Sequence, residues 1–574
     1  MLQHPETKYR PFSHSPHIAL RGRRWPDRRI ERAPVWMSSD LRDGNQALFE
    51  PMNAEAKLRF FKRLVAMGFK EIEIAFPSAS QTEFDFTRLL IEGGHIPEDV
   101  TIEILSPARA PLIERSFEAL DGARRAIVHL YNAIAPAFRE IVFGTDRAGI
   151  KALAVEATRV IRREAEKRPQ TEWVFQYSPE TFSAAETDFA REICDAVFDV
   201  WQPTPERKAI VNLPATVEVA SPNVYADQIE WMHRNLKHRD ALILSVHPHN
   251  DRGCAVAAAE LALMAGAERV EGCLFGNGER TGNADLVTLA LNLYAQGIDP
   301  GLDFSRIDEI ARCAEECTRI PVHPRHPYAG DLVFTAFSGS HQDAIKKGMA
   351  ARKAGKEAHW EVPYLPVDPA DLGRTYDSII RINSQSGKGG VAWLLEAAYG
   401  FVIPRRLQVE FGSAVQRHAD ESGREISAEE IREFFEREYL FPVDSFRLLG
   451  HRLHETEAGR QHIEIFLERE GKNFSCSGFG KDFIDAAWQA LNASAAGLKL
   501  LSHEERPAAS KSGTRTAAFV EIAADGIPGA LFGVGIDADK AAASLQALIN
   551  AIARAAVDGA IAIVPCKLGE AKCA

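Results

Sequence analysis

The sequence predicts an α/β protein whose first large domain is a (β/α)₈ barrel. From about residue 34 to residue 300, short β-rich runs alternate with longer segments of helical periodicity, a pattern typical of βα units around a parallel sheet. About eight of each fit this stretch, the number that such a barrel requires. An open doubly wound sheet would be expected to carry a GxGxxG turn after its first strand, and LRDGNQAL does not fit that pattern. The predicted strands are 35–38, 71–75, 101–105, 125–129, 173–177, 209–213, 242–247 and 269–275.

Residues 1–33 are expected to form an arm before the barrel. The Arg-rich stretch from Arg21 to Arg32 contains Asp27 and Glu31, so a solvated arm or an extension that packs on a partner is a better interpretation than a nucleic-acid patch. The arm has no apolar segment of the signal-peptide kind, and no window approaches the roughly 18 consecutive apolar residues of a membrane span. We therefore expect a cytoplasmic location and no membrane contact.

Two further regions are predicted after the barrel, which we place at residues 34–305. Residues 306–440 read as a linker with small helical subdomains, because Pro-rich crossings interrupt the helical segments there. Residues 441–574 contain a strand–strand–helix pattern twice, joined by the polar stretch 502–512. In each half a GxG lies between a strand and an amphipathic helix. We expect an α+β domain built by internal duplication.

The composition indicates a folded, acidic protein. The 574 residues carry a formal net charge of −12, which disfavours nucleic acid as a partner. Hydrophobic residues make up 45% and charged residues 26% of the chain, which is enough for a large core and unlike a disordered chain. The eight cysteines form no CxxC pair, and we expect most of them to be buried and reduced.

His247 and His249 are the most informative pair of polar residues. They lie two apart at the end of a predicted strand, so both imidazoles project to one face and can reach one cation. In a barrel, the carboxyl ends of the strands form the mouth of the active site. Taken without this context, each histidine could equally be a hydrogen-bonded core residue.

Polar residues after the first and eighth predicted strands extend this candidate site. Asp43 could supply an anionic oxygen ligand, and Arg42 could clamp a substrate carboxylate with its two-pronged guanidinium. Asn283, in GNGERTGNAD, could give an amide oxygen, although helix capping is the common role of such a residue. Two imidazoles, a carboxylate and an amide suit an open divalent site that could take Mg²⁺, Mn²⁺ or Zn²⁺.

A site of this kind suits chemistry on a 2-oxo acid. A divalent ion that binds the keto and carboxylate oxygens makes the keto carbon more electrophilic and stabilises a developing alkoxide. Such a reaction also needs a base. Glu180, after the fifth predicted strand, and His129, at the end of the fourth, both face the mouth in this arrangement, and either could instead be structural.

These motifs resemble those of one enzyme family. LRDGNQAL and HPHNDRGCAVAAAELALMAGAERVEGCLFGNGERTGN resemble the two signature segments of the 2-isopropylmalate synthase family in its longer bacterial form. The family belongs to the metal-dependent acyltransferases and lyases that share a (β/α)₈ barrel. The resemblance extends over about residues 34–400, through FPSASQTEFDF, YSPETF, NLPATVEVASPNVYADQIEW, FSGSHQDAI, PYLPVDPADLGRTY and NSQSGKGG.

The resemblance implies an activity and a set of site residues. Enzymes of this family condense acetyl-CoA with 3-methyl-2-oxobutanoate to give 2-isopropylmalate and CoA, the first committed step of leucine biosynthesis. The base is expected to be Glu180 or a relay of His341 and Tyr376, a pair expected to reach into the barrel of the partner subunit of a homodimer. The implied metal ligands are Asp43, His247, His249 and Asn283; the implied catalytic residues are Arg42, Glu180, His341 and Tyr376; the implied substrate contacts are Gln46, His129 and Thr216.

The C-terminal duplication resembles the family's leucine-binding regulatory domain. Gly533 and Gly535, in FGVGIDADKAAASLQAL, would let the backbone approach an effector closely. The first repeat, SGFGKDFIDA, departs from the family pattern because it lacks a further Gly-Asn-Gly run before the helix. The alternative to leucine binding is a domain that only dimerises.

Three other functions compete with this interpretation. A sister synthase that makes homocitrate or citramalate would use the same metal and thioester chemistry. A hydrolase of the amidohydrolase kind would carry its HxH on the first strand, whereas here the HxH falls late. A non-catalytic amino-acid sensor would not need the ligands Asp43, His247, His249 and Asn283, which are all present.

Overall fold

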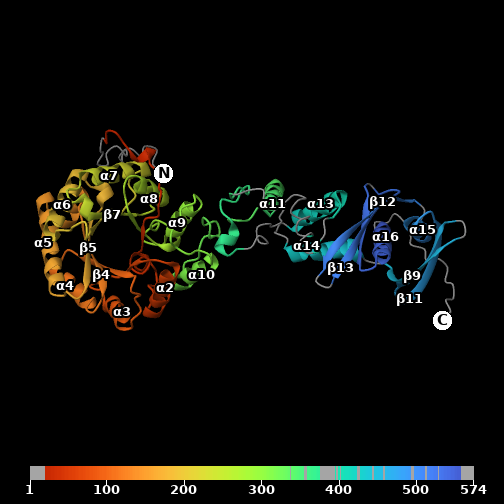
Figure 1. Cartoon of the computed structure of the whole chain (residues 1–574), viewed down its shortest axis with the longest axis horizontal. Coiled ribbons are helices and arrows are strands. Elements are labelled where there is room, and N and C mark those ends of the chain that lie inside the picture. Colours follow the sequence, from red (N-terminus) through yellow and green to blue (C-terminus); the bar gives the residue numbers. More distant parts are fainter. Residues whose placement is uncertain are drawn as a thin grey trace. The chain divides into compact units, whose positions relative to one another are not determined.

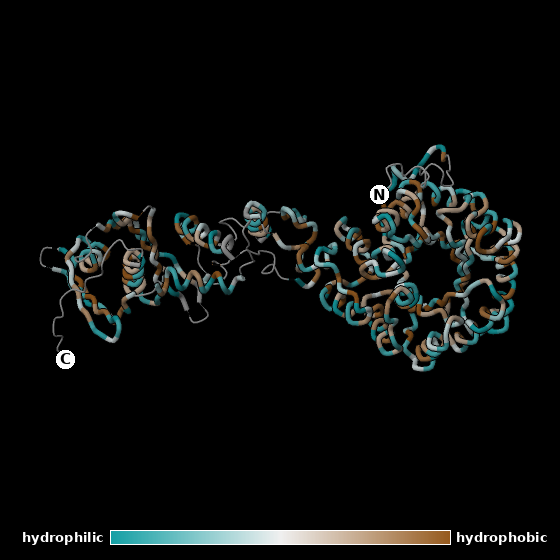
Figure 2. Tube along the Cα trace, turned by 180° about the vertical axis from the view of Figure 1, so that it is seen from behind, coloured by the Kyte–Doolittle hydropathy of each residue, from teal (hydrophilic) through white to brown (hydrophobic). Residues whose placement is uncertain are grey.

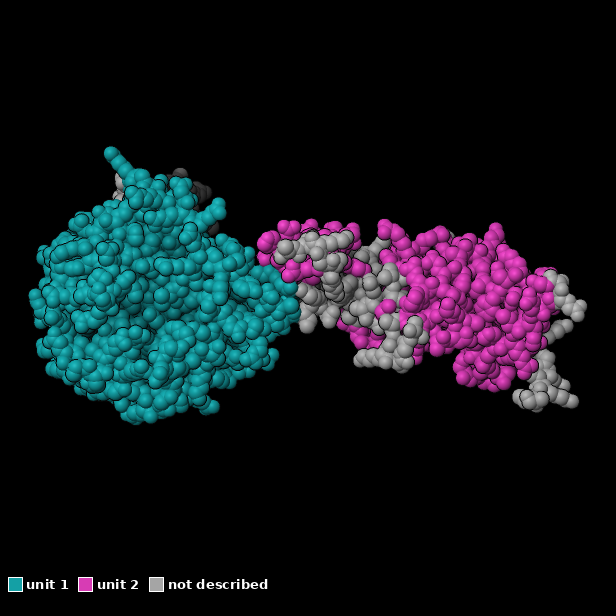
Figure 3. Space-filling model, viewed as in Figure 1, with its two compact units in different colours: residues 1–333, 367–374 teal, residues 334–366, 375–574 magenta. Residues whose placement is uncertain are grey.

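The structure is a computed structural model that describes residues 20–336, 338–353, 359–374, 395, 399–400, 403–422, 427–442, 445–456, 459–492, 497–510, 513–527 and 529–557. The chain divides into two compact units, shown in Figure 1 and coloured separately in Figure 3. The first unit comprises residues 1–333 and 367–374, and the second comprises residues 334–366 and 375–574. No helix in the described ranges combines the length and the hydropathy that a membrane span requires.

The first unit contains a closed barrel of eight parallel strands in sequence order, as the sequence predicts. The barrel closes where β1 (Val35–Ser38) pairs with β8 (Arg269–Gly272). The predicted eighth strand ends early, because a 3₁₀ turn with Phe275 at φ 57° follows Gly272. The other strands are β2 (Glu71–Ala75), β3 (Thr101–Pro107), β4 (Arg125–Ala133), β5 (Glu172–Glu180), β6 (Ala209–Ala215) and β7 (Leu242–Pro248).

Helices surround the barrel, and hydrophobic and hydrophilic residues alternate along most of them (Figure 2), because most bury one face against the strands. The helix Leu286–Tyr294 is buried on nearly all sides. The first of the surrounding helices begins at the cap Asn53, whose side chain accepts a hydrogen bond from the Ala56 N–H, and ends at Gly68 with φ 108°. The helices are α2 (Ala54–Met67), α3 (Gln81–Glu92), α4 (Ala110–Ala119), α5 (Arg147–Glu166), α6 (Thr187–Trp201), α7 (Pro222–Asn235), α8 (Ala255–Met264), α9 (Leu286–Tyr294) and α10 (Ile307–Thr318).

The described part of the N-terminal arm packs on its own barrel. The Arg23 guanidinium donates two hydrogen bonds of 2.7 Å to the buried Asp227 carboxylate on α7. The Trp25 indole N–H donates to the same carboxylate at 2.9 Å, and the Arg24 N–H donates to Glu230 at 2.9 Å. Arg23 of the basic stretch therefore neutralises the buried Asp227, and backbone N–H groups of the arm bind the buried Glu230 of the same helix, which differs from the solvated arm that its composition suggests.

The second unit contains two antiparallel sheets of three strands each, in the orders β11-β10-β9 and β12-β13-β14. Each sheet is followed by a helix, so the duplication is present but each repeat has one strand more than predicted. The polar stretch 502–512, expected to join the repeats, belongs largely to β12, which pairs with β13 along its length. The elements are β9 (Arg447–Glu455), β10 (Gln461–Arg469), β11 (Lys472–Gly480), α15 (Phe483–Asn492), β12 (Leu498–Ser510), β13 (Gly513–Ala524), β14 (Leu531–Asp537) and α16 (Lys540–Val557), preceded by α11 (Gly339–Lys353), α13 (Arg405–Ser422) and α14 (Ala428–Phe435).

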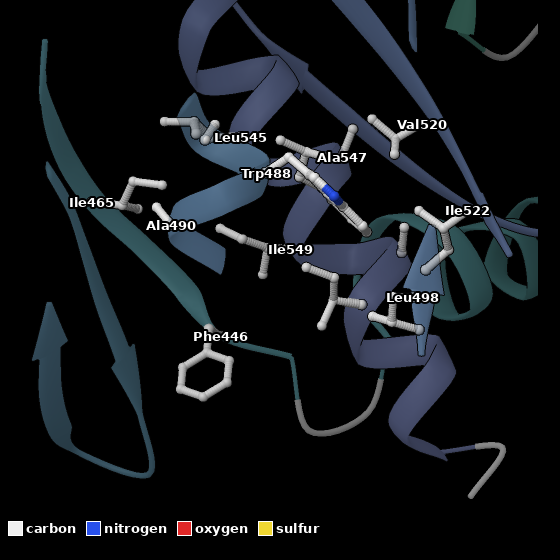
Figure 4. Packing of buried hydrophobic residues seen from close by; sticks show 14 of the residues in the cluster. Phe446, Ile465, Trp488, Ala490, Leu498, Val520, Ile522, Leu545, Ala547 and Ile549 are labelled. Atoms are coloured by element: carbon white, nitrogen blue, oxygen red, sulfur yellow. The ribbon is translucent and has the colours of Figure 1, made fainter. Parts of the chain in front are cut away.

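The main hydrophobic core of the second unit lies between α15, α16 and the two sheets (Figure 4). Ile465 of β10, Trp488 of α15 and Ile549 of α16 are buried in it. Gly533 and Gly535 lie where β14 passes under α16, and a Cβ at Gly535 would collide with the backbone oxygen of Ala543. Their lack of a side chain thus permits close packing of helix on strand.

Candidate active site

Four of the predicted polar side chains converge at the carboxyl ends of β1, β7 and β8. Asp43 opens the short helix α1 (Asp43–Gln46) after β1, His247 lies in β7, and His249 follows it. The Nε2 atoms of His247 and His249 lie 3.4 and 3.8 Å from Oδ2 of Asp43, and the Asn283 amide donates to the same oxygen at 2.7 Å. All four are buried. The sequence spacing of HxH therefore does bring both imidazoles to one carboxylate.

The donor atoms in this cluster fit a divalent metal. The ligand atoms of Asp43, His247 and His249 all lie within 4.8 Å of one another. Nδ1 of His249 and Oδ1 of Asn283 are buried and have no hydrogen-bond partner, whereas buried polar atoms in proteins normally have one. Two imidazoles, a carboxylate and an amide oxygen form an open, non-thiolate set of the kind that binds Mg²⁺, Mn²⁺ or Zn²⁺.

Glu271 fixes the orientation of His247. Its carboxylate accepts from Nδ1 of His247 at 2.8 Å, which leaves Nε2 directed toward Asp43. A carboxylate behind a liganding histidine is the usual way to fix the tautomer that binds a metal. Burial disfavours the charged form of His247, but its hydrogen bonds to Asp43 and Glu271 outweigh burial and raise its pKa to about 10. Burial and the charge of His247 lower the pKa of His249 to about 4, so that imidazole is neutral.

Arg42 joins the cluster to β2. Its guanidinium lies 2.9 Å from Asp43 and 2.8 Å from Glu73 of β2, and all three are buried. Burial opposes ionisation of Asp43, but the charge of Arg42 and the hydrogen bond and charge of His247 outweigh it and hold the pKa of that carboxyl below its usual range. Asp43 is therefore an anion at neutral pH, the form in which a carboxyl group binds a metal.

The cluster opens into a cleft of about 320 Å³ at the mouth of the barrel. Gln46, His129, Glu180 and Thr216 line this cleft together with Arg42, so these predicted site residues share one cavity. Burial raises the pKa of Glu180 above its usual range. Further lining residues are Phe76, Leu105, Tyr131, Ser178, Asn212, Pro214, Glu279 and Arg280.

A charged network beneath the cleft was not expected from the motifs. Arg269 of β8 is completely buried, and it pairs with Glu71, Glu103 and Glu271. His129 lies 2.9 Å from Glu103 and 3.5 Å from Glu73. The available signal is in the strand sequences RVEG, EIEIA and TIEIL, because a charged residue in a strand that a barrel buries on both faces must have a partner.

The loops after β6, β7 and β8 are tied together at the edge of the cleft. The Arg280 guanidinium donates to Asp251 at 2.7 Å and 3.1 Å and to the backbone oxygen of Thr216 at 2.5 Å. The Thr216 hydroxyl accepts from the Thr181 N–H at 2.9 Å. Glu218 in turn accepts from the Arg252 N–H at 2.6 Å. These bonds hold Thr216 at the cleft.

Two predicted catalytic residues lie outside the first unit. His341 belongs to the second unit, on α11, where its ring stacks on Tyr364 with 4.0 Å between ring centroids. Tyr376 lies outside the described residues. The predicted effector residues Gly533 and Gly535 lie in the core of the second unit against α16.

Comparison with known proteins identifies the family. A 2-isopropylmalate synthase from Ralstonia nicotianae is 62% identical over 97% of this chain and 96% of its own length. This chain belongs to the 2-isopropylmalate synthase family. Enzymes of the same name from Paraburkholderia xenovorans and from Pseudomonas syringae pv. syringae are 61% and 56% identical, over 97% and 96% of this chain and 96% and 98% of their own lengths.

Three family descriptions match consecutive parts of this synthase-family chain. An HMGL-like domain matches residues 33–313, which contain the barrel. An alpha-isopropylmalate synthase post-catalytic domain matches residues 331–396, and a LeuA allosteric (dimerisation) domain matches residues 425–556. Among solved structures, a hydroxymethylglutaryl-CoA lyase from Pseudomonas aeruginosa matches 50% of this chain and 93% of its own, with 18% identity and a TM-score of 0.42.

Proposed function

We propose that this protein condenses acetyl-CoA with 3-methyl-2-oxobutanoate and hydrolyses the resulting thioester, releasing 2-isopropylmalate and CoA. The observation that supports this most strongly is the cluster of Asp43, His247, His249 and Asn283 at the mouth of a barrel of this family. A divalent metal bound there would polarise the keto group of a 2-oxo acid.

The side chains around the cluster would supply the other functions. Arg42, fixed between Asp43 and Glu73, would present positive charge to the oxygen that becomes negative during the condensation. Thr216 and Gln46 would hydrogen-bond the 2-oxo acid, and His129 would form part of its pocket. These donors and cations are held in place by the buried network, so little reorganisation would be needed during the reaction.

The proton alpha to the thioester needs a base, for which the described cleft offers Glu180. Its pKa is raised by burial, which brings it nearer to the working pH of a general base. The family resemblance also assigns His341 and Tyr376 to this step. A His341→Ala variant with unchanged turnover would exclude His341 from the mechanism, and a large loss with intact 2-oxo acid binding would support it.

We propose that the domains are an arm at 1–33, the catalytic barrel at 34–305, a linker at 306–440 and a regulatory domain at 441–574.

Leucine would bind in the regulatory domain of a homodimer and inhibit the reaction in the barrel. Support comes from the match of residues 425–556 to the LeuA allosteric (dimerisation) domain. Because Gly533 and Gly535 already have a packing role, a contact between them and the effector stays a prediction. An initial rate that does not respond to leucine in the full-length enzyme would contradict feedback inhibition.

The reaction is tested by measuring thiol release from acetyl-CoA with a panel of 2-oxo acids, with added divalent metal and after chelation. Metal-dependent release that is fastest with 3-methyl-2-oxobutanoate is the expected result. Preference for 2-oxoglutarate or pyruvate would instead indicate homocitrate or citramalate synthesis. No release with any acceptor would contradict the proposed activity.

A further inference from the structure

A basic hollow containing a thiol lies on the outer wall of the barrel, between α2 and α10. It has a volume of about 540 Å³. Its walls carry four cationic side chains, Arg59, Lys62, Arg63 and Arg312, against two carboxylates, Glu309 and Glu316. Cys313 lines the hollow as well. None of these residues takes part in the cleft at the mouth of the barrel.

A second cysteine, Cys317, lies beside Cys313 on the same helix. Cys313 and Cys317 are four residues apart on α10, so they lie on the same face of the helix, which packs on α2. The Arg59 guanidinium donates to Cys317 Sγ at 3.3 Å, and Cys317 Sγ lies 3.6 Å from the backbone oxygen of Ala56. Both cysteines are almost fully buried, at 8% and 4% exposed, and Cys313 meets solvent at the hollow.

The surroundings favour the thiolate of Cys313. A hydrogen bond from Cys317, together with Arg63 and Arg59, outweighs burial and lowers the pKa of Cys313, whereas the same pairing and burial raise the pKa of Cys317. Burial instead raises the pKa of Cys194 and of Cys273 well above the usual range. A thiolate is the reactive form of cysteine, so Cys313 combines reactivity with a cationic approach path.

We propose that Cys313 is a modification site at which an anionic low-molecular-weight disulfide, of which glutathione disulfide is the probe, forms a mixed disulfide. The Cys313 thiolate attacks one sulfur of the small disulfide, the S–S bond of the reagent breaks, and a new S–S bond joins Cys313 to one half. The other half leaves as a thiolate and takes a proton from water. Cys313 is oxidised and the reagent is reduced, so no further oxidant is needed.

The test compares three disulfides of different charge on the full-length protein: glutathione disulfide, the neutral 2-hydroxyethyl disulfide and the cationic cystamine. Peptide-level mass spectrometry follows each cysteine, and each rate at Cys313 is divided by the rate at Cys254 in the same sample. We expect this Cys313-to-Cys254 rate ratio to be at least about tenfold higher with glutathione disulfide than with cystamine. Equal rate ratios with the two reagents, or a higher rate ratio with cystamine, would overturn the proposal.

Two variants separate charge from folding. Lys62→Gln with Arg312→Gln removes two exposed cations of the hollow and leaves the packed face of both helices intact. We expect it to slow the glutathione disulfide reaction about tenfold. Arg124→Gln with Lys237→Gln, two exposed cations elsewhere on the unit, is the matched control and should stay within about twofold of wild type. Equal rates in the two double variants would overturn the role of the hollow.

Discussion

Replacing Glu271 with Gln is expected to weaken the candidate metal site without touching a proposed ligand. Glu271 accepts from four donors: Oε1 from Gln176 at 2.7 Å and from Arg269, and Oε2 from His247 at 2.8 Å and from Asn212 at 3.1 Å. A carboxamide has only one acceptor oxygen. Because the Arg269 guanidinium stays charged, the amide oxygen is expected to face Arg269. The NH₂ group then faces the donors of His247 and Asn212, so His247 loses its acceptor and Arg269 loses the charge of one of its three carboxylate partners.

The expected magnitudes follow from these contacts. Loss of the group that orients a liganding histidine typically lowers metal affinity by about 10-fold to 100-fold. Removing one partner of a buried ion pair costs roughly 3–5 kcal/mol, and the lower end applies because Arg269 keeps Glu71 at 2.5 Å and Glu103 at 2.7 Å. We therefore expect a loss of about 3 kcal/mol in the barrel together with the weaker affinity.

Metal affinity is measured by calorimetric titration of protein from which a chelator has removed bound metal. Stability is measured by denaturant unfolding followed by Trp fluorescence. The matched control is Glu268→Gln, on the segment that leads into β8, where Glu268 pairs with Arg239 at 2.6 Å. That variant should keep wild-type metal affinity. Wild-type affinity in Glu271→Gln would refute the inference that Glu271 orients His247 for a metal.

Three further changes have defined outcomes. Glu180→Gln should lower kcat by about 10²-fold to 10⁴-fold while metal affinity stays unchanged, and a kcat within twofold of wild type would rule Glu180 out as the base. Gly535→Ala should lower the stability of the second unit by about 1–3 kcal/mol in thermal unfolding, because its Cβ meets α16, whereas Gly450→Ala on β9 has open space and should be nearly neutral. Hydrogen bonds from Arg139 lower the pKa of Glu186 to about 2. The ionised Glu186 therefore stabilises the fold fully above about pH 4.5, and this stabilisation is lost as pH falls toward 2. The difference in unfolding free energy between wild type and Glu186→Gln should narrow over this range, and a constant difference would contradict the role of the Arg139–Glu186 pair.

The barrel could be predicted because its strands and helices have different hydrophobic periods and alternate regularly. The convergence of His247 and His249 on Asp43 could be predicted because an HxH at the end of a barrel strand places both imidazoles on one face at the mouth. Glu73, Glu103 and Glu271 were missed because each needs a partner on another strand, and pairings across the barrel interior are not visible in local sequence. The same limit applies to Arg280, whose partners Asp251 and Thr216 lie on two other loops.

The strands of the second unit show where composition misleads. β12 contains His503, Glu504 and Glu505, which read as a polar connection. Polar residues are compatible with this strand because its pairing with β13 depends on backbone groups. Gly533 and Gly535 are ambiguous in the sequence, because a GxG pattern is compatible with close approach of a ligand and with close packing of a helix. The position of α16 shows that these two glycines permit helix packing.

Metal binding by the purified, chelated protein bears most directly on the proposed active site. Calorimetric titration with Mn²⁺ should show one site per chain in the wild type, and His249→Ala should bind at least about tenfold more weakly because it removes a ligand while leaving the Glu271 network intact. Thiol release from acetyl-CoA with 3-methyl-2-oxobutanoate should fall in parallel. Full activity in a metal-free wild-type enzyme, or unchanged binding in His249→Ala, would contradict the proposal that this cluster holds the metal on which the condensation depends.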